Sequence, residues 1–194
     1  MKRTGTLVIL GIIVVIGFLG CNGYNGVIGQ DENVKKAWNN VQSEYQKRSD
    51  LVTQLVNTVK GVANFEQKTL TDVIEARSKA TSITLKAEDL TPENMAKFQA
   101  AQDQLKGSLS RLLVVAEQYP QLKATENFTK LQGQLEGIEN DVKTSRNTFN
   151  EAINSYNVKV RSFPMNILAG MFGFKAKEGF KADAGTEKAP EVKF

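Results

Sequence analysis

The chain has 194 residues, enough for one domain with a leader and a tail, and it contains no histidine and a single cysteine, Cys21. The lack of histidine removes the commonest general base and metal ligand, and a lone cysteine excludes an intrachain disulfide and a Cys–His nucleophile pair. The net charge of +4 comes from 25 basic and 21 acidic residues mixed along the chain, so no basic run predicts nucleic-acid binding.

Residues 1–28 are predicted to attach the chain to a membrane. The basic residues Lys2 and Arg3 precede an unbroken apolar run from Leu7 to Leu19. A transmembrane helix needs about 20 mostly apolar residues, which this run reaches only if the uncharged stretch up to Ile28 is included. With that stretch, the segment is long enough for an uncleaved single-pass helix, which is the first interpretation.

The cysteine leaves two further interpretations open for the same segment. In a lipoprotein signal, Cys21 would become the lipidated first residue of the mature chain, and Gly20 suits the position before it. A cleaved secretory signal is the third interpretation, although Phe18 occupies a position where a small residue is preferred. For a membrane span, the basic pair Lys2 and Arg3 favours an inside N-terminus, which places the main domain on the outer or periplasmic side.

The segment from Asp31 to about Ser82 is predicted to begin the helical domain. It contains no proline and one glycine, and Asp31 is a suitable N-cap. A break or kink at Gly61 would divide the segment into two helices. One polar residue, Arg48, interrupts an otherwise apolar heptad pattern. The pattern comprises Val34, Trp38, Val41, Tyr45, Arg48, Val52, Leu55, Val59 and Val62.

Two more long helices are predicted after this segment. The first begins at Thr91, which can cap it, with Pro92 at the first helical position, and it ends before Pro120. The other runs from about Thr125 to Arg161. The heptad positions are Met95, Phe98, Gln102, Leu105, Leu109, Leu112, Ala116 and Tyr119, and then Phe128, Leu131, Leu135, Ile138, Val142, Ser145, Phe149, Ala152, Tyr156 and Val160.

These patterns predict an all-α fold. Residues 29–163 would form an antiparallel up-down bundle of three or four long helices, because short connections make neighbouring helices antiparallel. Narrow apolar stripes can also be buried against another copy of the chain, so a homo-oligomer is possible. The apolar segment 164–180 would either cap the bundle or contact a membrane or partner. Residues 181–194 are polar, and we expect a mobile tail there.

Several long stretches of the sequence resemble the LemA family. They are Ala37–Gly61 (AWNNVQSEYQKRSDLVTQLVNTVKG), Thr69–Thr81, Leu109–Asn140, Phe149–Asn157 and Phe163–Phe174. The resemblance implies a membrane-anchored bacterial protein with an antiparallel helical bundle and no established catalytic activity, substrate or cofactor. The sequence departs from the family pattern at Thr53, where members often have proline, and at Cys21, which many members lack.

Arg48 and Asp50 are the candidate site residues, because they lie in a region whose heptad pattern is otherwise apolar. A buried guanidinium needs carboxylate or carbonyl partners, and Glu117 or Glu139 on a facing helix could supply one. Arg48 and Asp50 either set the register of the helices or contact a ligand or partner. Cys21 is a candidate for lipid attachment. No catalytic, cofactor-binding or metal-binding residue is predicted.

These observations predict a non-enzymatic structural or protein-interaction scaffold, held at a membrane of the bacterial cell envelope and binding an unidentified protein. The alternative is a receptor or enzyme with a small-ligand pocket between the helices, the usual location of such a pocket in a bundle. A pocket lined by Arg48, Arg111 or Arg146 would favour that alternative.

Overall fold

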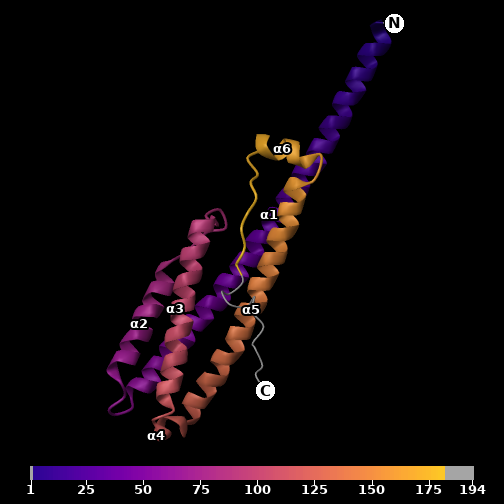
Figure 1. Ribbon diagram of the computed structural model, residues 1–194. Coiled ribbons are helices and arrows are strands. Elements are labelled where there is room, and N and C mark those ends of the chain that lie inside the picture. Colours follow the sequence, from indigo (N-terminus) through magenta and orange to yellow (C-terminus); the bar gives the residue numbers. More distant parts are fainter. Residues whose placement is uncertain (1, 182–194) are drawn as a thin grey trace, which may run out of the picture.

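The computed structural model describes residues 2–181, apart from the side chains of residues 2–9, 12–19 and 21. All regular secondary structure in this range is helical, which confirms the predicted all-α class (Figure 1). The helices are α1 (Lys2–Lys60), α2 (Gln67–Ser82), α3 (Pro92–Ala116), α4 (Pro120–Lys123), α5 (Glu126–Arg161) and α6 (Met165–Met171).

Helix α1 runs without a break from Lys2 to Lys60, so the predicted helix start at Asp31 is wrong. Asp31 lies in the middle of the helix, where its carboxylate forms ion pairs with lysine side chains. No proline interrupts α1. The part of α1 around Gly23 also packs closely against α6, because a Cβ at Gly23 would lie 3.1 Å from the Met165 sulfur.

The break predicted at Gly61 is confirmed, because α1 ends at Lys60 and α2 turns back beside it. Asn64 in this turn has a positive φ of 62°, a conformation that asparagine tolerates better than most residues. The Tyr119 hydroxyl donates a hydrogen bond to the Asn64 carbonyl at 2.9 Å. The described part of the chain therefore has four long helices, α1, α2, α3 and α5.

Helix α3 starts as the sequence predicts. The Thr91 Oγ1 accepts a hydrogen bond from the Asn94 backbone N at 3.2 Å, and Pro92 lies in the first turn. Helix α3 packs along α2, and α5 packs along α1, with neighbouring helices antiparallel (Figure 1). The α2–α3 pair covers only the half of the α1–α5 pair that lies farther from the N-terminus.

The buried apolar side chains form two clusters along the bundle axis. The cluster nearer the N-terminus, here called the proximal core, includes Trp38, Tyr45, Phe98, Phe149, Tyr156 and Phe180. The cluster nearer the α1–α2 turn, the distal core, includes Val52, Leu55, Val59, Val73, Leu105, Leu109, Leu112, Leu135 and Ile138. All heptad positions predicted in α1 from Val34 to Val59 are buried.

The segment predicted as an apolar cap, 164–180, contains α6 and most of an extended stretch. Helix α6 buries Met165 and Ala169 against the end of the bundle. The chain then reverses at Gly173, whose φ is 78°, and residues 173–181 run back along α5 (Figure 1). We call residues 173–181 the C-terminal strap. Of the predicted tail 181–194, only Lys181 lies within the described residues.

Among the described side chains, no helix has a stretch long and apolar enough to cross a membrane. Most of the apolar run from Leu7 to Leu19 lies outside the described side chains, as does Cys21.

Candidate functional site

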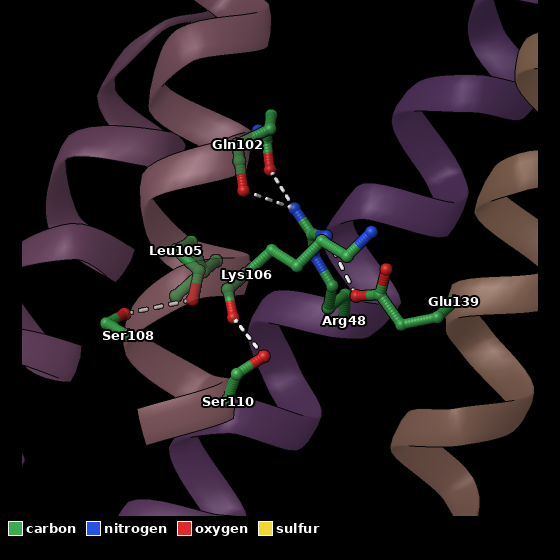
Figure 2. Close-up of polar contacts among 7 residues, drawn as sticks. All are labelled: Arg48, Gln102, Leu105, Lys106, Ser108, Ser110 and Glu139. Atoms are coloured by element: carbon green, nitrogen blue, oxygen red, sulfur yellow. Dashed lines mark hydrogen bonds and ion pairs between the residues drawn. The ribbon is translucent and has the colours of Figure 1, made fainter. Parts of the chain in front are cut away.

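Arg48 of α1 lies in the middle of the bundle with 2% of its surface exposed. Its Nη1 donates to Glu139 Oε1 of α5 at 2.9 Å, and its Nη2 donates to Gln102 Oε1 of α3 at 2.5 Å (Figure 2). The guanidinium also lies 4.9 Å from the centre of the Tyr45 ring. Arg48 therefore connects three helices through charge-assisted hydrogen bonds, which are stronger than neutral ones.

The fourth long helix joins the same network. The Gln102 Nε2 donates to the carbonyl of Ala80 near the end of α2 at 3.3 Å. Beside it, Arg77 of α2 donates from Nε to the carbonyl of Ser49 at 3.0 Å. These contacts form what we call the polar layer, which consists of Arg48, Ser49, Arg77, Gln102 and Glu139.

The polar layer lies between the proximal and distal cores. On α1, Tyr45 belongs to the proximal core and Val52 to the distal core, with Arg48 between them. On α3, Phe98 and Leu105 flank Gln102 in the same way. A shift of α1, α3 or α5 by a turn would deprive the buried guanidinium of at least one partner, which is costly. The geometry therefore fits a residue that sets the helix register.

The sequence-predicted site residues differ in their placement. Of the two acidic partners predicted for Arg48, the structure places Glu139 beside it. Glu117 instead pairs with Lys123, at 2.5 Å. Asp50 is exposed and accepts a hydrogen bond from Gln46 Nε2 of its own helix, so it does not set the register together with Arg48, and a partner contact at Asp50 stays a prediction. Asp50 points away from the partners of Arg48 because a residue two positions along a helix lies on another face.

The three arginines that would have favoured a small-ligand pocket do not converge. Arg111 lies on the surface and its Nη1 is 3.6 Å from Asp72 Oδ2. Arg48 is enclosed in the polar layer, and Arg146 lies outside it, on α5. Burial raises the pKa of the Tyr45 phenol to about 12, so this hydroxyl beside Arg48 stays protonated at neutral pH.

A groove with a volume of about 600 Å³ lies beside the polar layer, between α3, α5 and the strap. Lys106 lines it from α3, Lys143 and Arg146 line it from α5, and Lys181 lines it from the strap. Glu139 is the acidic residue among the described lining. We call this the basic groove. Cations gathered in a concave surface concentrate the positive potential there and attract anionic groups.

Two asparagines of α5 hold the C-terminal strap by its backbone. Asn157 donates to the Lys177 carbonyl at 2.8 Å and accepts from the Lys177 backbone N at 2.9 Å. Asn150 forms the same pair of bonds with Phe180, at 3.1 and 2.8 Å. A side chain at Gly179 would clash with the Asn150 amide, so the close approach requires glycine. We call Asn150 and Asn157 the asparagine clamps.

Phe180 of the strap is buried in the proximal core. Its ring centre lies 5.7 Å from that of Phe149 and 6.1 Å from that of Trp38, and the Arg146 guanidinium covers its ring at 4.5 Å. The Trp38 indole N–H donates to the Leu85 carbonyl at 2.8 Å, which fixes its orientation. The strap therefore forms part of the core and does more than cover its surface.

An ion pair fastens the middle of the strap to α1. The Lys177 Nζ lies 2.6 Å from Asp31 Oδ1, and Lys35 lies 3.3 Å from the other carboxylate oxygen. Burial acts to raise the pKa of Asp31, but the hydrogen bonds and charges of Lys177 and Lys35 outweigh it and lower that pKa.

The asparagine clamps and Phe180 were not predicted as structural contacts. Both clamps lie in the Phe149–Asn157 stretch that carries part of the family resemblance, but an isolated asparagine in a helix is normally interpreted as an exposed residue. The feature of the sequence that could have indicated a shared contact is their spacing of seven residues, which places them on one face of the helix. Among the described side chains, no cluster of three or more acidic or cysteine residues is placed to hold a metal ion.

Comparison with known proteins decides the family. The model of the LemA family matches residues 37–194. The chain belongs to the LemA family. Over 189 residues it is 23% identical to Protein LemA of Metamycoplasma hominis, an alignment that covers 93% of this chain and 83% of that protein. This near full-length match places the polar layer, the basic groove and the clamps within the part shared with the LemA family.

Part of the chain is also similar to proteins named as magnetosome proteins. Two proteins named MamQ from Paramagnetospirillum magneticum are each 34% identical over 74 residues, which covers 38% of this chain. A MamQ protein of Magnetospirillum gryphiswaldense is 32% identical over 73 residues. The match spans 27% of the length of each of these relatives.

Proposed function

We propose that this protein is a membrane-tethered, non-enzymatic scaffold that binds another protein at the bacterial cell envelope. The observation that carries the proposal is the continuity of α1 from Lys2 to Lys60. The apolar run from Leu7 to Leu19 and the buried positions from Val34 to Val59 belong to one helix. A single helix that leaves a membrane and enters a folded core holds that core at a defined height and direction.

The tether has two chemical forms that the proposal accommodates. In the first, the α1 segment before the bundle spans the bilayer as an uncleaved helix, with Lys2 and Arg3 inside and the bundle outside. In the second, the chain begins at Cys21 and an attached lipid holds it. Both forms keep the bundle close to the membrane surface.

The side chains of the polar layer support a structural role over a catalytic one. Arg48 has no histidine partner, since the chain contains none, and a guanidinium does not deprotonate in proteins. Its Nη1 is hydrogen-bonded to Glu139 and its Nη2 to Gln102, so both terminal nitrogens have partners. Only 2% of the surface of Arg48 is exposed, so the guanidinium itself is not open to a substrate.

The basic groove is the surface that we propose for partner binding, and the partner segment is acidic. Lys106 and Lys143 are exposed side chains on two different helices that face the same groove. Complementary charge of this kind directs encounter and selects a partner more than it adds affinity. A scaffold needs this property when it recruits one protein among many at the same membrane.

The tether is tested by fractionation and intact mass. We expect the mature protein to sediment with membranes and a chain without residues 1–21 to become soluble. A full-length, unmodified mass supports the spanning helix, and a chain that starts at Cys21 with added acyl mass supports the lipid anchor. A soluble mature protein would overturn the tether in both forms.

Partner binding is tested by affinity capture from membranes with a charge-reversed groove. The variant Lys106→Glu/Lys143→Glu should lose the captured partner, while Lys68→Glu/Lys130→Glu should keep it. The control changes the net charge by the same amount at exposed lysines outside the groove. Equal capture by both variants would contradict the groove as the binding surface.

The small-ligand alternative is favoured by one observation, the size of the groove. Its volume of about 600 Å³ lies within the range of small-molecule sites. The class of ligand would be a small polyanion, because Lys106, Lys143 and Lys181 surround the space. Titration calorimetry of the purified protein with citrate tests this candidate, and the variant Lys106→Glu/Lys143→Glu is the control. Citrate binding that the variant loses would favour the small-ligand site over a protein partner.

A further inference from the structure

The large apolar side chains that remain exposed are concentrated at one end of the described molecule. They lie on α1 before the bundle, at the end of α5, on α6 and next to α6. Phe163 and Met171 are each 79% exposed and Ile167 is 63% exposed, which is unusual for such residues. The members are Leu10, Tyr24, Ile28, Val158, Phe163, Ile167, Met171 and Phe172. Exposed apolar side chains gathered at one end of a molecule indicate a contact with a membrane or a protein.

Helix α6 is fixed at the point where α1 leaves the bundle. It lies across α1 there (Figure 1), and a Cβ at Gly20 would lie 3.7 Å from Leu168. One face of α6 buries Met165 and Ala169 against the bundle, while Ile167 and Met171 face away from it. The exposed apolar face is therefore held in place by the packing of the opposite face.

The height of α6 along α1 matches the edge of a bilayer. The apolar run starts at Leu7, and at about 1.5 Å per residue the helix from there to Leu19 covers roughly 20 Å. A hydrocarbon core is roughly 30 Å thick, so this run alone is short. Continuing to Tyr24 brings the length to roughly 27 Å, and Gly20, which contacts α6, lies within this last part.

The surroundings of α6 have the chemistry of a membrane interface. The Tyr24 ring lies 5.1 Å from Phe172 and 5.5 Å from Phe174, centre to centre, so three aromatic rings gather beside α6. Aromatic rings are enriched at the level of the lipid headgroups. The exposed cations Arg161 and Lys175 flank this part of the chain, where anionic headgroups would attract them.

We propose that the exposed face of α6, with Phe163, Tyr24 and Phe172, lies in the headgroup region of a bilayer that contains anionic lipid. We call these residues the collar. It is a second membrane contact beside the tether, and it rests on the proposed function, because α1 brings it to the surface. With two contacts, the bundle has a fixed tilt relative to the membrane, and the basic groove faces one direction.

The test uses the full-length protein reconstituted in vesicles of phosphatidylethanolamine and phosphatidylglycerol. An environment-sensitive fluorescent amino acid replaces Ile167 in one variant and Val114 in the other, with Cys21 unchanged. Val114 is the matched control because it is a 68% exposed apolar residue on α3, away from the collar. Nitroxide lipids labelled near the headgroup serve as quenchers.

The collar predicts a shift to shorter emission wavelength and quenching at position 167, with neither change at position 114. If the vesicles float with the protein but position 167 behaves like position 114, the collar is wrong and the tether stands. If the protein does not float with the vesicles, the tether itself fails and the collar fails with it. Equal quenching at both positions also contradicts the collar, because the bundle would then lie flat on the bilayer.

Discussion

The proximal and distal cores are built differently, although the same two helices, α1 and α5, run through both. In the distal core, four antiparallel helices supply mainly aliphatic side chains at heptad spacing. In the proximal core, α2 is missing because it ends at Ser82. Its place is filled by the α2–α3 connection, with Leu85 and Leu90, and by Phe180 of the strap.

This difference shows how a bundle can be closed without a fourth helix. A regular heptad stripe needs a facing helix, and where none is present, larger side chains must fill the space. The rings of Trp38, Phe98, Phe149 and Phe180 do so, with centre-to-centre distances from 5.1 to 6.4 Å. Aromatic pairs at such distances contribute more than their buried area alone. The polar layer marks the boundary between the two kinds of packing.

The largest expected effect follows from breaking that boundary. Arg48→Ala opens a cavity in the bundle and leaves Gln102 Oε1 buried without its donor, so we expect the free energy of unfolding to fall by about 3–5 kcal/mol. Urea unfolding followed by circular dichroism measures the change. A change smaller than about 1 kcal/mol would show that the layer contributes little to stability.

A double variant distinguishes a register device from a source of stability. Arg48→Leu/Gln102→Leu replaces both buried partners with apolar side chains, while Glu139, whose side chain is 32% exposed, can reach water. We expect stability to stay the same or to rise by up to about 4 kcal/mol, as apolar replacements of buried ion pairs often do. A loss as large as that of Arg48→Ala would mean that the layer stabilises the fold directly.

The next effect concerns the residue that closes the proximal core. Phe180→Ala should lower the free energy of unfolding by about 3 kcal/mol, the lower end for a core phenylalanine. It should also expose Lys177 and Lys181 to trypsin. The matched control is Phe65→Ala, because Phe65 has the same exposed fraction, 8%, but lies in the distal core. If both variants release the strap equally, the strap depends on global stability and not on Phe180.

The distal core could be predicted from the sequence, because its packing repeats a local pattern. Positions such as Leu105, Leu109 and Leu112 are spaced so that one helix face is apolar, and a facing helix follows from that. The same rule identifies Arg48 as the polar position in the heptad pattern of α1. It does not choose between Glu117 and Glu139 as the partner, because that choice depends on how the helices pack, and the structure places Glu139 there.

The proximal core could not be predicted in the same way. Phe180 follows a charged, glycine-containing stretch, where nothing periodic marks it as buried. Its position depends on Asn150 and Asn157, far away in the sequence, and on a gap that exists only because α2 is short. The predicted start of a helix at Asp31 was wrong for a related reason. Asp31 resembles an N-cap in its local sequence, but α1 continues through it and makes tertiary contacts on both sides.

A smaller effect is expected at the asparagine clamps. Asn150→Leu removes both hydrogen bonds to the backbone of Phe180 and leaves that N–H and carbonyl without these partners, which should cost about 1–3 kcal/mol. Hydrogen exchange of the Phe180 amide, together with urea unfolding, measures the loss. Asn154→Leu is the control, because Asn154 is an exposed residue of the same helix. A faster exchange in the control variant would trace the effect to α5 itself.

The smallest effect is the pH dependence of the Asp31–Lys177 contact. Because the pKa of Asp31 is lowered in the folded state, its ion pair stabilises the protein fully above the unfolded pKa of 3.8 and loses this effect as pH falls through the folded value. Asp31→Asn should therefore be less stable than the original chain by about 0.5–1 kcal/mol at pH 7, and the difference should shrink below about pH 4. Urea unfolding of both proteins at pH 7, 5 and 3 measures this difference, in which other titrating groups cancel. Asp50→Asn, an exposed acid on the same helix, should show a smaller difference at every pH. If the Asp31→Asn difference instead grows as the pH falls, the carboxylate is not stabilised by Lys177, and Lys177 is held in place by the Asn157 clamp alone.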